Sequence, residues 1–432
     1  VLAMASNPSY NLNMFTGGLS QEDYATLRDD TRTPLLNKAI GSRGTPGSIF
    51  KMTTGLAGLM EGVLTPSTRI SDEGEFRKHI NDPNAKGPSC WIKSGYAAHA
   101  NQTLSDALKN SCNYFFFDVS YAMGIDKLYG WAADLGLDSK TNVQLTGEVA
   151  SQMASQNALY NPDTPPNGIS ALVYNNIYRM LQEACEAEGL SYDDERYDAV
   201  TLELMNMAVD SDTQEYGSDA RALMRSELKL PMSRITGGLF SEISMQLNQI
   251  IWNSNQTIVA GIGQSVSMMT PIGIARYLSA LVNGGNVYDA NIIDYIVSPN
   301  GTVVEDQAPR LVRNLEVPQE YLDVIKEGMA NVVSPEEGGT AASYFEGFKY
   351  LGQFGGKTGT AQVSRIDLED NSWFVAFAPF DKPEIAIVIY IPHGYKGGLS
   401  STAAKTIIEY YMDNREAAGE VPQIPGDNTL VP

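Results

Sequence analysis

A serine and a lysine lie three residues apart where the sequence predicts the start of a helix. Ser48 and Lys51 follow Pro46-Gly47, and the apolar spacing after them predicts that a helix begins at this serine. Residues i and i+3 of a helix share a face about 5–6 Å apart, so the Lys51 amine can reach the Ser48 hydroxyl. A lysine whose pKa is lowered by burial can take the serine proton. The pair predicts a serine nucleophile, although a helix cap followed by a surface lysine has the same residues.

A second serine lies in a predicted turn between two short helices. The turn is Ser111-Cys112-Asn113, and the helices are predicted over residues 103–109 and 114–123. The Ser111 hydroxyl can relay a proton between Lys51 and an amine, and the Asn113 amide can hold a peptide carbonyl. An ordinary helix cap is the alternative explanation.

A third group of polar residues lies in a predicted strand over residues 352–363. It supplies one cation, two hydroxyls and a glycine: Lys357, Thr358, Thr360 and Gly359. The Lys357 cation can bind a carboxylate and lower the pKa of Lys51, while the glycine lets a substrate backbone lie close along the strand. The backbone N–H groups of Ser48 and Thr360 would form an oxyanion hole.

The three motifs occur in the order Ser-x-x-Lys, Ser-x-Asn, Lys-Thr-Gly, each on its expected local structure. In this order they resemble the penicillin-binding protein and serine β-lactamase superfamily, specifically the transpeptidase domain of class B penicillin-binding proteins. The resemblance covers about residues 1–150 and 255–415. Further stretches agree with it: residues 15–20, 261–264, 270–271, 281–285 and 373–379.

The resemblance implies a peptidoglycan D,D-transpeptidase. Ser48 would attack the D-Ala-D-Ala end of one stem peptide and release D-alanine, with Lys51 as the base. An amine of a neighbouring stem peptide would then resolve the acyl-enzyme into a cross-link, and β-lactams would trap the serine. The resemblance implies these roles for the other motif residues: Ser111 and Asn113 as relay and substrate holder, and Lys357, Thr358, Gly359 and Thr360 as carboxylate and oxyanion binders.

The resemblance also implies the cellular setting. We expect stem peptides and β-lactams as ligands, and a glycosyltransferase with divisome or elongasome proteins as partners. The expected location is extracytoplasmic, with an N-terminal membrane anchor that this sequence does not contain. No cofactor is expected for the chemistry itself.

Three other functions use the same fold. A D,D-carboxypeptidase would use the same residues with water as the acceptor, and a non-enzymatic β-lactam sensor would keep only the acylation step. A β-lactamase needs a base that activates water, and the notable match to its Glu-x-x-Asn loop is Glu203-Leu-Met-Asn206.

Possible metal ligands gather in a proline- and glycine-rich loop before Ser111. Asp72, His79, Cys90 and His99 offer one carboxylate, two imidazoles and one thiolate, a set that suits tetrahedral zinc. Such a zinc would be structural, because Ser48 and Lys51 suffice for the chemistry. Unrelated surface histidines and a buried Cys90 explain the same residues, and Cys112 is expected to be a small buried side chain.

Charge and composition exclude some functions. The chain has 432 residues and a formal net charge of −21, from 30 Lys and Arg against 51 Asp and Glu. Nucleic-acid binding needs clustered Lys and Arg, so we expect no nucleic-acid partner. No window reaches the roughly 18 apolar residues of a membrane helix, and three cysteines are too few for a disulfide-rich scaffold.

An acidic segment interrupts the resemblance between residues 150 and 255. Residues 183–227 contain thirteen acidic residues and three bases, Arg196, Arg221 and Arg225. We predict a helical insertion within one transpeptidase domain over residues 1–432. A solvated surface or a partner site explains its acidic side chains.

The predicted fold class is α+β: an antiparallel sheet flanked by helices, with an all-helical subdomain and the acidic helical insertion. The sheet strands are expected at 352–363, 372–379 and 384–391, with smaller strands between 286 and 313. Helices are expected near 22–28, 317–332 and 401–412, and a first strand over 1–6.

Overall fold

A three-stranded antiparallel sheet carries the Lys-Thr-Gly motif on an edge strand. A computed structural model describes residues 1–92, 99–210, 216–306, 308–361 and 369–418. The strands are β5 (Gly355–Ala361), β6 (Asn371–Ala378) and β7 (Ile385–Ile391), in the order β5-β6-β7. Lys357 lies opposite Val375, and Thr360 lies opposite Ser372. The three predicted strands and the α+β class are confirmed.

The central strand β6 is buried on both faces. Its side chains point alternately to the two faces, and each face belongs to a different hydrophobic core. Trp373, Val375 and Phe377 belong to the large core that contains the first two motifs. Phe374, Ala376 and Ala378 face a smaller core that includes residues of α17 (Gly397–Ala418). Successive side chains of a strand point to opposite faces, which explains how one hydrophobic run serves two layers.

The large core surrounds one central helix, α3 (Lys51–Met60), of which nine residues are buried. A helix that is buried on nearly every side belongs inside a protein, and α3 packs against several other helices. The helices of this all-helical part are α4 (Leu104–Lys109), α5 (Asn113–Met123), α6 (Ile125–Asp134), α13 (Ser254–Ala260), α14 (Pro271–Val282) and α15 (Gln319–Val333). Short α16 (Ala342–Phe345) precedes β5.

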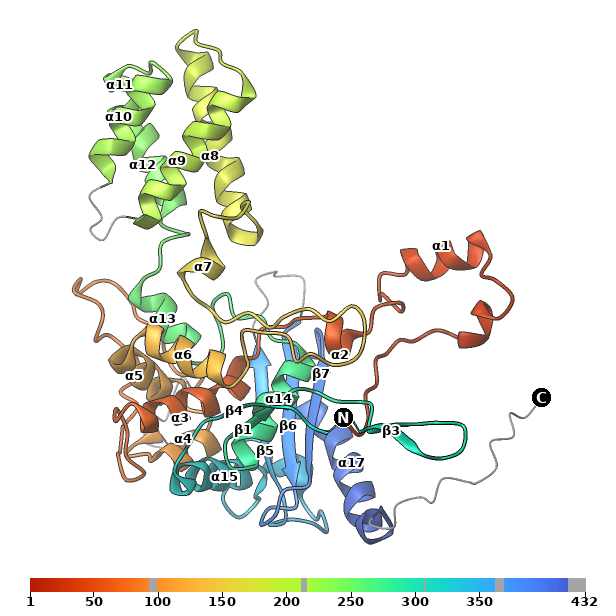
Figure 1. The fold of residues 1–432 in the computed structure, drawn as a ribbon. Coiled ribbons are helices and arrows are strands. Elements are labelled where there is room, and N and C mark those ends of the chain that lie inside the picture. The colour runs from red at the N-terminus through yellow and green to blue at the C-terminus, as the bar shows by residue number, and fades with distance from the viewer. Residues whose placement is uncertain (93–98, 211–215, 307, 362–368, 419–432) are drawn as a thin grey trace.

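The acidic insertion is helical, as predicted, and has its own hydrophobic core. Figure 1 shows its helices standing apart from the sheet, joined to the rest of the chain through α7 (Gln156–Leu159) and α13. Its helices are α8 (Gly168–Ala187), α9 (Asp194–Asp210), α10 (Gly217–Glu227), α11 (Met232–Arg234) and α12 (Phe240–Leu247), with a π-helical turn over Ile235–Leu239. Val173, Ile177 and Leu181 of α8 recur at four-residue spacing and face this core.

Four short strands form two hairpin-like pairs, as the sequence predicts for residues 286–313. β1 (Asn286–Tyr288) pairs with β4 (Leu311–Asn314), and β2 (Tyr295–Val297) pairs with β3 (Val303–Asp306). Within the described ranges, no helix is long and apolar enough to cross a membrane.

The prediction of a strand over residues 1–6 is wrong. These residues form no strand, and Leu2 is 83% exposed. A strand needs backbone partners for its N–H and C=O groups, and apolar residues alone do not supply them. The segment is followed by η1 (Leu12–Phe15), α1 (Gln21–Asp29) and α2 (Lys38–Gly41). The predicted helix near 22–28 is confirmed by α1.

Candidate active site

The nucleophile candidate lies in a tight turn that presses against the edge strand. Ser48 is partly exposed in a 3-10 turn, η2 (Gly47–Phe50), that leads into α3. Gly47 has φ +58°, and a Cβ there would lie 2.5 Å from the Thr360 carbonyl oxygen. A Cβ at Gly359 would lie 2.9 Å from the Ile49 side chain. Glycine at both positions therefore lets the turn and β5 approach closely.

Two side chains fix this turn from behind. The Tyr277 hydroxyl donates to the Ile49 carbonyl, and the Trp373 indole N–H donates to the Thr45 carbonyl at 2.9 Å. Both aromatic residues are fully buried. Buried donors that satisfy loop carbonyls hold the turn in one conformation.

The Lys51 side chain is fully buried below Ser48. Its Nζ donates to the Ser111 carbonyl at 2.8 Å and to Asn113 Oδ1 at 2.7 Å, and lies 3.3 Å from Ser111 Oγ. Burial lowers the pKa of Lys51 to about 8, although negative charge on Cys90 and Cys112 opposes this shift. Among the described residues none hydrogen-bonds to the Ser48 hydroxyl, so the expected contact between Lys51 and Ser48 is not formed.

Lys357 of β5 hydrogen-bonds to Ser111 as well. It is fully buried, and its Nζ donates to Ser111 Oγ at 3.0 Å and to the Thr358 carbonyl at 3.1 Å. Burial, together with the charge of Lys51, lowers the pKa of Lys357 well below its ordinary value. The Ser111 hydroxyl thus bridges two lysines whose burial and mutual repulsion favour loss of a proton.

The turn that holds Ser111 has an unfavourable backbone conformation. Ser111 has φ +50°, in the left-handed region that costs a non-glycine residue about 1–2 kcal/mol. Trp91 supports this turn, because its indole N–H lies 3.2 Å from the Asn110 carbonyl oxygen and 3.1 Å from that of Ser111. The Trp91 side chain itself is 55% exposed.

The remaining residues of the third motif line β5. Thr358 Oγ1 lies 3.3 Å from Thr340 Oγ1, and Thr360 Oγ1 accepts a hydrogen bond from the Gly397 N–H at 3.1 Å. Thr358 is partly exposed and Thr360 is exposed. Two hydroxyls on an accessible strand edge can bind a carboxylate or an extended peptide.

A cluster of four possible metal ligands lies directly behind the Ser111 turn. Asp72, Cys90, His99 and Cys112 are all buried, and their ligand atoms lie within 4.8 Å of one another. His99 Nδ1 is 3.6 Å from both Cys90 Sγ and Asp72 Oδ2. Two thiols, one imidazole and one carboxylate match the donors that zinc prefers, so this cluster could hold a metal ion.

The pKa values of these groups are shifted because the groups are buried together. A hydrogen bond from the Cys112 thiol lowers the pKa of Cys90, and the resulting thiolate together with burial raises the pKa of Cys112. Burial raises the pKa of Asp72 to about 6. A cation at the centre would favour the charged form of all three groups.

The predicted ligand His79 does not belong to this cluster. Its ring stacks on Phe76 with centroids 5.8 Å apart, and its buried Nδ1 has no hydrogen-bond partner among the described residues. Cys112 takes the fourth position, because the Ser-x-Asn turn folds against the loop that carries the other three ligands. The expectation that Cys112 is only a small buried side chain missed this contact.

Comparison with known proteins decides the family. The model of the penicillin-binding protein transpeptidase domain matches residues 1–180 and 229–412. The chain belongs to this family. The match includes both ends of the predicted insertion and leaves residues 181–228 of the transpeptidase domain unmatched.

Curated relatives of this transpeptidase domain are named peptidoglycan D,D-transpeptidases. MrdA of Haemophilus influenzae is 26% identical over 98% of this chain and 53% of its own length. MrdA of Escherichia coli K12 is 24% identical over 98% of this chain and 54% of its own length. The chain thus spans about half the length of the curated relatives that it matches.

Solved structures share the fold of the transpeptidase domain. Pseudomonas aeruginosa PBP2 in complex with WCK 5153 has a TM-score of 0.65, 24% identity, and coverage of 96% of this chain and 69% of that chain. The ceftriaxone acyl-enzyme of Mycobacterium tuberculosis penicillin-binding protein A has a TM-score of 0.64, 18% identity, and coverage of 94% and 70%.

The structure brings the three predicted motifs of the transpeptidase domain to one place, and it adds residues that sequence reasoning missed. Trp91 and Thr340 lie in loops with no periodic pattern, so nothing local indicates their role. Cys112 carried a usable signal, because it lies between two predicted site residues and a thiol is a common zinc ligand.

Proposed function

We propose that this chain is the catalytic domain of a class B peptidoglycan D,D-transpeptidase. The observation that carries the proposal is the pair of buried lysines, Lys51 and Lys357, whose ammonium groups share the Ser111 hydroxyl. A purely structural site would not bury two unpaired cations together, because their desolvation and repulsion cost free energy. Such a site can hold and move a proton beside a nucleophile.

In acylation, the Ser48 hydroxyl oxygen attacks the carbonyl carbon of the penultimate D-alanine of a donor stem peptide. The hydroxyl proton passes to neutral Lys51, whose amine leaves the Asn113 amide oxygen to reach it. Backbone N–H groups of Ser48 and Thr360 stabilise the oxyanion. The proton then reaches the leaving D-alanine amine through Ser111, and the acyl group stays on Ser48 as an ester.

In deacylation the same steps run in reverse. The amine of an acceptor stem peptide attacks the ester carbonyl and gives its proton to Lys51 through Ser111, and Ser48 leaves with a proton from Lys51.

The terminal carboxylate of the donor binds near Lys357 and Thr358 before cleavage. This carboxylate favours the charged form of Lys357, which offsets the burial of that ammonium group.

The proposal is tested by incubating the protein with penicillin and following its intact mass, with peptide mapping of the adduct. We expect one long-lived adduct on Ser48, and none on a Ser48→Ala variant with unchanged thermal unfolding. An adduct on folded Ser48→Ala would show that another residue is the nucleophile. Rapid hydrolysis of the drug with no lasting adduct would instead identify a β-lactamase.

The structure argues against the β-lactamase alternative in one respect. Glu203 and Asn206 lie on α9 of the insertion, which Figure 1 shows far from β5. Asn206 Oδ1 accepts a hydrogen bond from the Tyr160 hydroxyl at 2.6 Å within that helical unit. A water-activating base has to lie beside the acyl-enzyme, so this Glu-x-x-Asn match carries no catalytic role. Transpeptidase and carboxypeptidase are separated by supplying an amine acceptor and measuring cross-linked against hydrolysed product.

We further propose that Asp72, Cys90, His99 and Cys112 hold a structural zinc ion. Bound zinc would supply a cross-link between the loop and the Ser-x-Asn turn, and the chemistry itself needs no metal. The backbone N–H of Asn113 donates to Cys90 Sγ at 3.2 Å, so the cluster also positions the motif directly. Sulfur is a weak acceptor, and its thiolate form strengthens this bond.

The partners and location follow from the proposed substrate. Peptidoglycan stem peptides lie outside the cytoplasmic membrane, so we place the protein there, held by a membrane anchor. Solved relatives include PBP2 of Helicobacter pylori in complex with MreC and a peptidoglycan synthase complex that coordinates polymerization and crosslinking. We propose a glycosyltransferase and elongasome proteins as partners of this protein too.

A further inference from the structure

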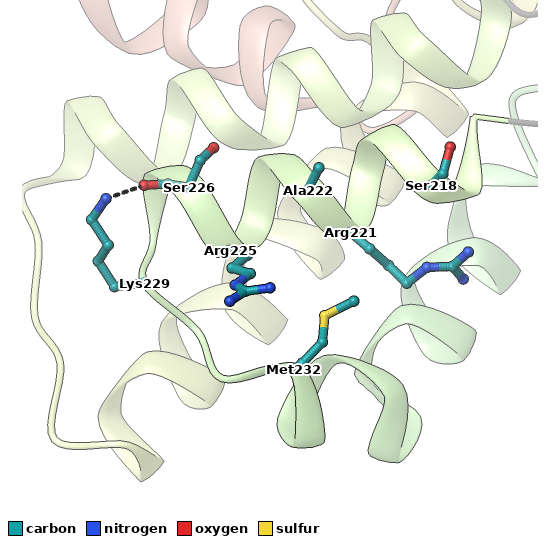
Figure 2. Close-up of a pocket in the computed structure, with 7 residues that line it drawn as sticks. All are labelled: Ser218, Arg221, Ala222, Arg225, Ser226, Lys229 and Met232. Atoms are coloured by element: carbon teal, nitrogen blue, oxygen red, sulfur yellow. Dashed lines mark hydrogen bonds between the residues drawn. The ribbon is translucent and has the colours of Figure 1, made fainter.

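A pocket on the helical insertion is lined by basic residues. It lies between α10 and the start of α11 and has a volume of about 590 Å³. Figure 2 shows Arg225 on α10 and Met232 on α11 pointing into the same space. The lining residues are Ser218, Arg221, Ala222, Arg225, Ser226, Lys229 and Met232.

The three cations of this pocket repeat at four-residue intervals. Arg221 and Arg225 are one turn apart on α10, and Lys229 follows just beyond the end of this helix. Residues four apart on a helix rise about 6 Å, which places Arg221 and Arg225 one above the other along α10. Lys229 lies outside the helix, and Figure 2 shows it beyond Arg225, so the three cations follow one another along the pocket. This row is unexpected in a chain with net charge −21, and it lies at the edge of its most acidic segment.

None of the three cations forms an ion pair with any residue in the described ranges. The Arg221 guanidinium lies 4.6 Å above the centre of the Phe240 ring, and Lys229 Nζ donates to the Ser226 carbonyl at 2.6 Å. By contrast, Arg196 of the same insertion pairs with Glu227 at 3.1 Å. Neighbouring like charges one turn apart repel each other, and a bound anion would remove this cost.

We propose that this pocket binds an acidic peptide segment of a partner protein. Guanidinium groups bind carboxylates through paired N–H donors, so Arg221 and Arg225 would each take one acidic side chain, with Lys229 taking a third. Alternate residues of an extended peptide are about 6.6–6.8 Å apart, which is close to the rise of about 6 Å between Arg221 and Arg225. The proposal does not depend on the reaction catalysed at Ser48.

Two features favour a peptide over a phosphate polymer or a membrane surface. Met232 is 42% exposed and faces the arginines, and a flexible thioether packs against many apolar side chains. A phosphate polymer offers no apolar group for this contact. The pocket is also concave and lies between two helices, whereas a flat membrane surface needs a protruding basic face. The family model leaves α10 unmatched, whereas Lys229 and Met232 lie at the start of its second matched range, so the α10 side of this pocket is particular to this chain.

The test is a fluorescence anisotropy titration of the whole chain with a labelled peptide, Glu-Ala-Glu-Leu-Glu-Ala-Glu. The matching peptide with Gln in place of Glu controls for non-specific binding. Arg225→Glu is expected to weaken binding at least about tenfold, because it replaces an attraction with a repulsion at the centre of the row. Arg179→Glu on α8, an exposed arginine 3.9 Å from Glu183, changes the net charge equally and should leave the affinity unchanged.

Four outcomes would overturn the proposal. These are no binding of the glutamate peptide, equal binding of the glutamine peptide, equal loss in both variants, and tighter binding of inorganic polyphosphate or of anionic phospholipid vesicles than of the peptide. Concentration-dependent self-association that Arg225→Glu abolishes would assign the pocket to a second copy of this chain instead. Arg225 is exposed, so the variant should unfold at an unchanged temperature and still react with penicillin at Ser48.

Discussion

At the scale of single residues, the proposed chemistry depends on how easily Lys51 loses its proton. Burial disfavours the charged form and brings its pKa from 10.5 to about 8. Only the neutral amine can accept the Ser48 proton, and the neutral fraction rises as the pH rises through about 8. We therefore expect the rate of penicillin acylation to increase from about pH 6 to about pH 9 and then to level off.

This pH dependence is measured as a second-order acylation rate constant, with thermal unfolding recorded at each pH to exclude loss of fold. A rate that is constant or falls between about pH 7 and about pH 9 would contradict the role of Lys51 as base.

Ser111 is the residue that both lysines share. Replacing it in Ser111→Ala removes the proton relay but keeps the positive φ that this backbone position requires. We expect acylation to slow about 100-fold or more, which is the usual effect of losing one general acid–base group. Ser105→Ala, at a buried serine of α4, is the matched control and should react at nearly the normal rate. Acylation of Ser111→Ala within about twofold of the unmodified protein would exclude the relay.

Trp91 supports the same turn from the protein surface. Trp91→Phe keeps an aromatic ring but removes the N–H that donates to the carbonyls of Asn110 and Ser111. One lost hydrogen bond costs about 1 kcal/mol, so we expect acylation about fivefold slower, with unchanged metal content. Trp131→Phe removes an indole N–H that binds Glu61 elsewhere and should leave the rate unchanged. Equal rates in both variants would mean that the turn needs no support from Trp91.

The motif residues could be predicted from the sequence because each motif is local and keeps a fixed spacing on one element. Trp91 and Thr340 could not, because loops of irregular conformation bring them to the site. The choice of His79 over Cys112 failed for the same reason. Proximity in sequence groups His79 with the other ligands, whereas the fold packs its ring against Phe76.

At the scale of elements, the loop over residues 65–92 depends on its ligands more than on its own packing. This stretch contains neither a helix nor a strand, and Asp72 and Cys90 are among its buried side chains. We expect protein prepared without chelators to contain about one zinc ion per chain, and Cys90→Ser to lose it and acylate more slowly. Cys185→Ser, at the buried cysteine of the insertion, should change neither quantity.

A further pair of variants tests which of the two histidines is a metal ligand. His79→Gln should retain the metal, whereas His99→Gln should not, and elemental analysis of both measures this directly. Metal lost from His79→Gln but kept in His99→Gln would show that the cluster has been assigned to the wrong histidine.

The elements differ in how well the sequence predicts them. The three sheet strands are predicted well because β6 is apolar from Trp373 to Ala378 and its neighbours alternate or carry a motif. Residues 1–6 have similar local composition but no partner strand, and only the tertiary structure shows that difference. The helix from Ser48 starts three residues later than predicted, since Gly47–Phe50 forms a 3-10 turn first.

At the scale of the whole molecule, the chain enters and leaves the insertion at one point. The Gln156 side chain accepts a hydrogen bond from the Trp252 N–H at 2.8 Å and donates to the Ile250 carbonyl at 2.9 Å. A segment whose ends meet and which has its own core can be removed without stretching the remaining chain. The core of the insertion is therefore expected to fold independently of the rest of the chain.

We predict that replacing residues 162–249 with a short Gly-Ser linker leaves a folded protein. Its penicillin acylation rate should stay within about threefold of that of the full chain, because the three motifs lie outside the insertion. Linkers of two lengths serve as the control for strain at the junction. A folded deletion variant that no longer reacts with penicillin would show that the insertion shapes the active site.

The hydrogen bonds of Lys51 bear on how long an ester on Ser48 would last. In this structure its amine is bound to Ser111 and Asn113 and forms no hydrogen bond with Ser48, so the proposed base is held by other partners than the proposed nucleophile. An ester formed on Ser48 would then wait beside a base that is already occupied, and a passing water molecule would find no partner to activate it. If the proposed mechanism holds, the arrival of an acceptor sets the lifetime of this ester, and a drug that leaves no room for the acceptor stays attached.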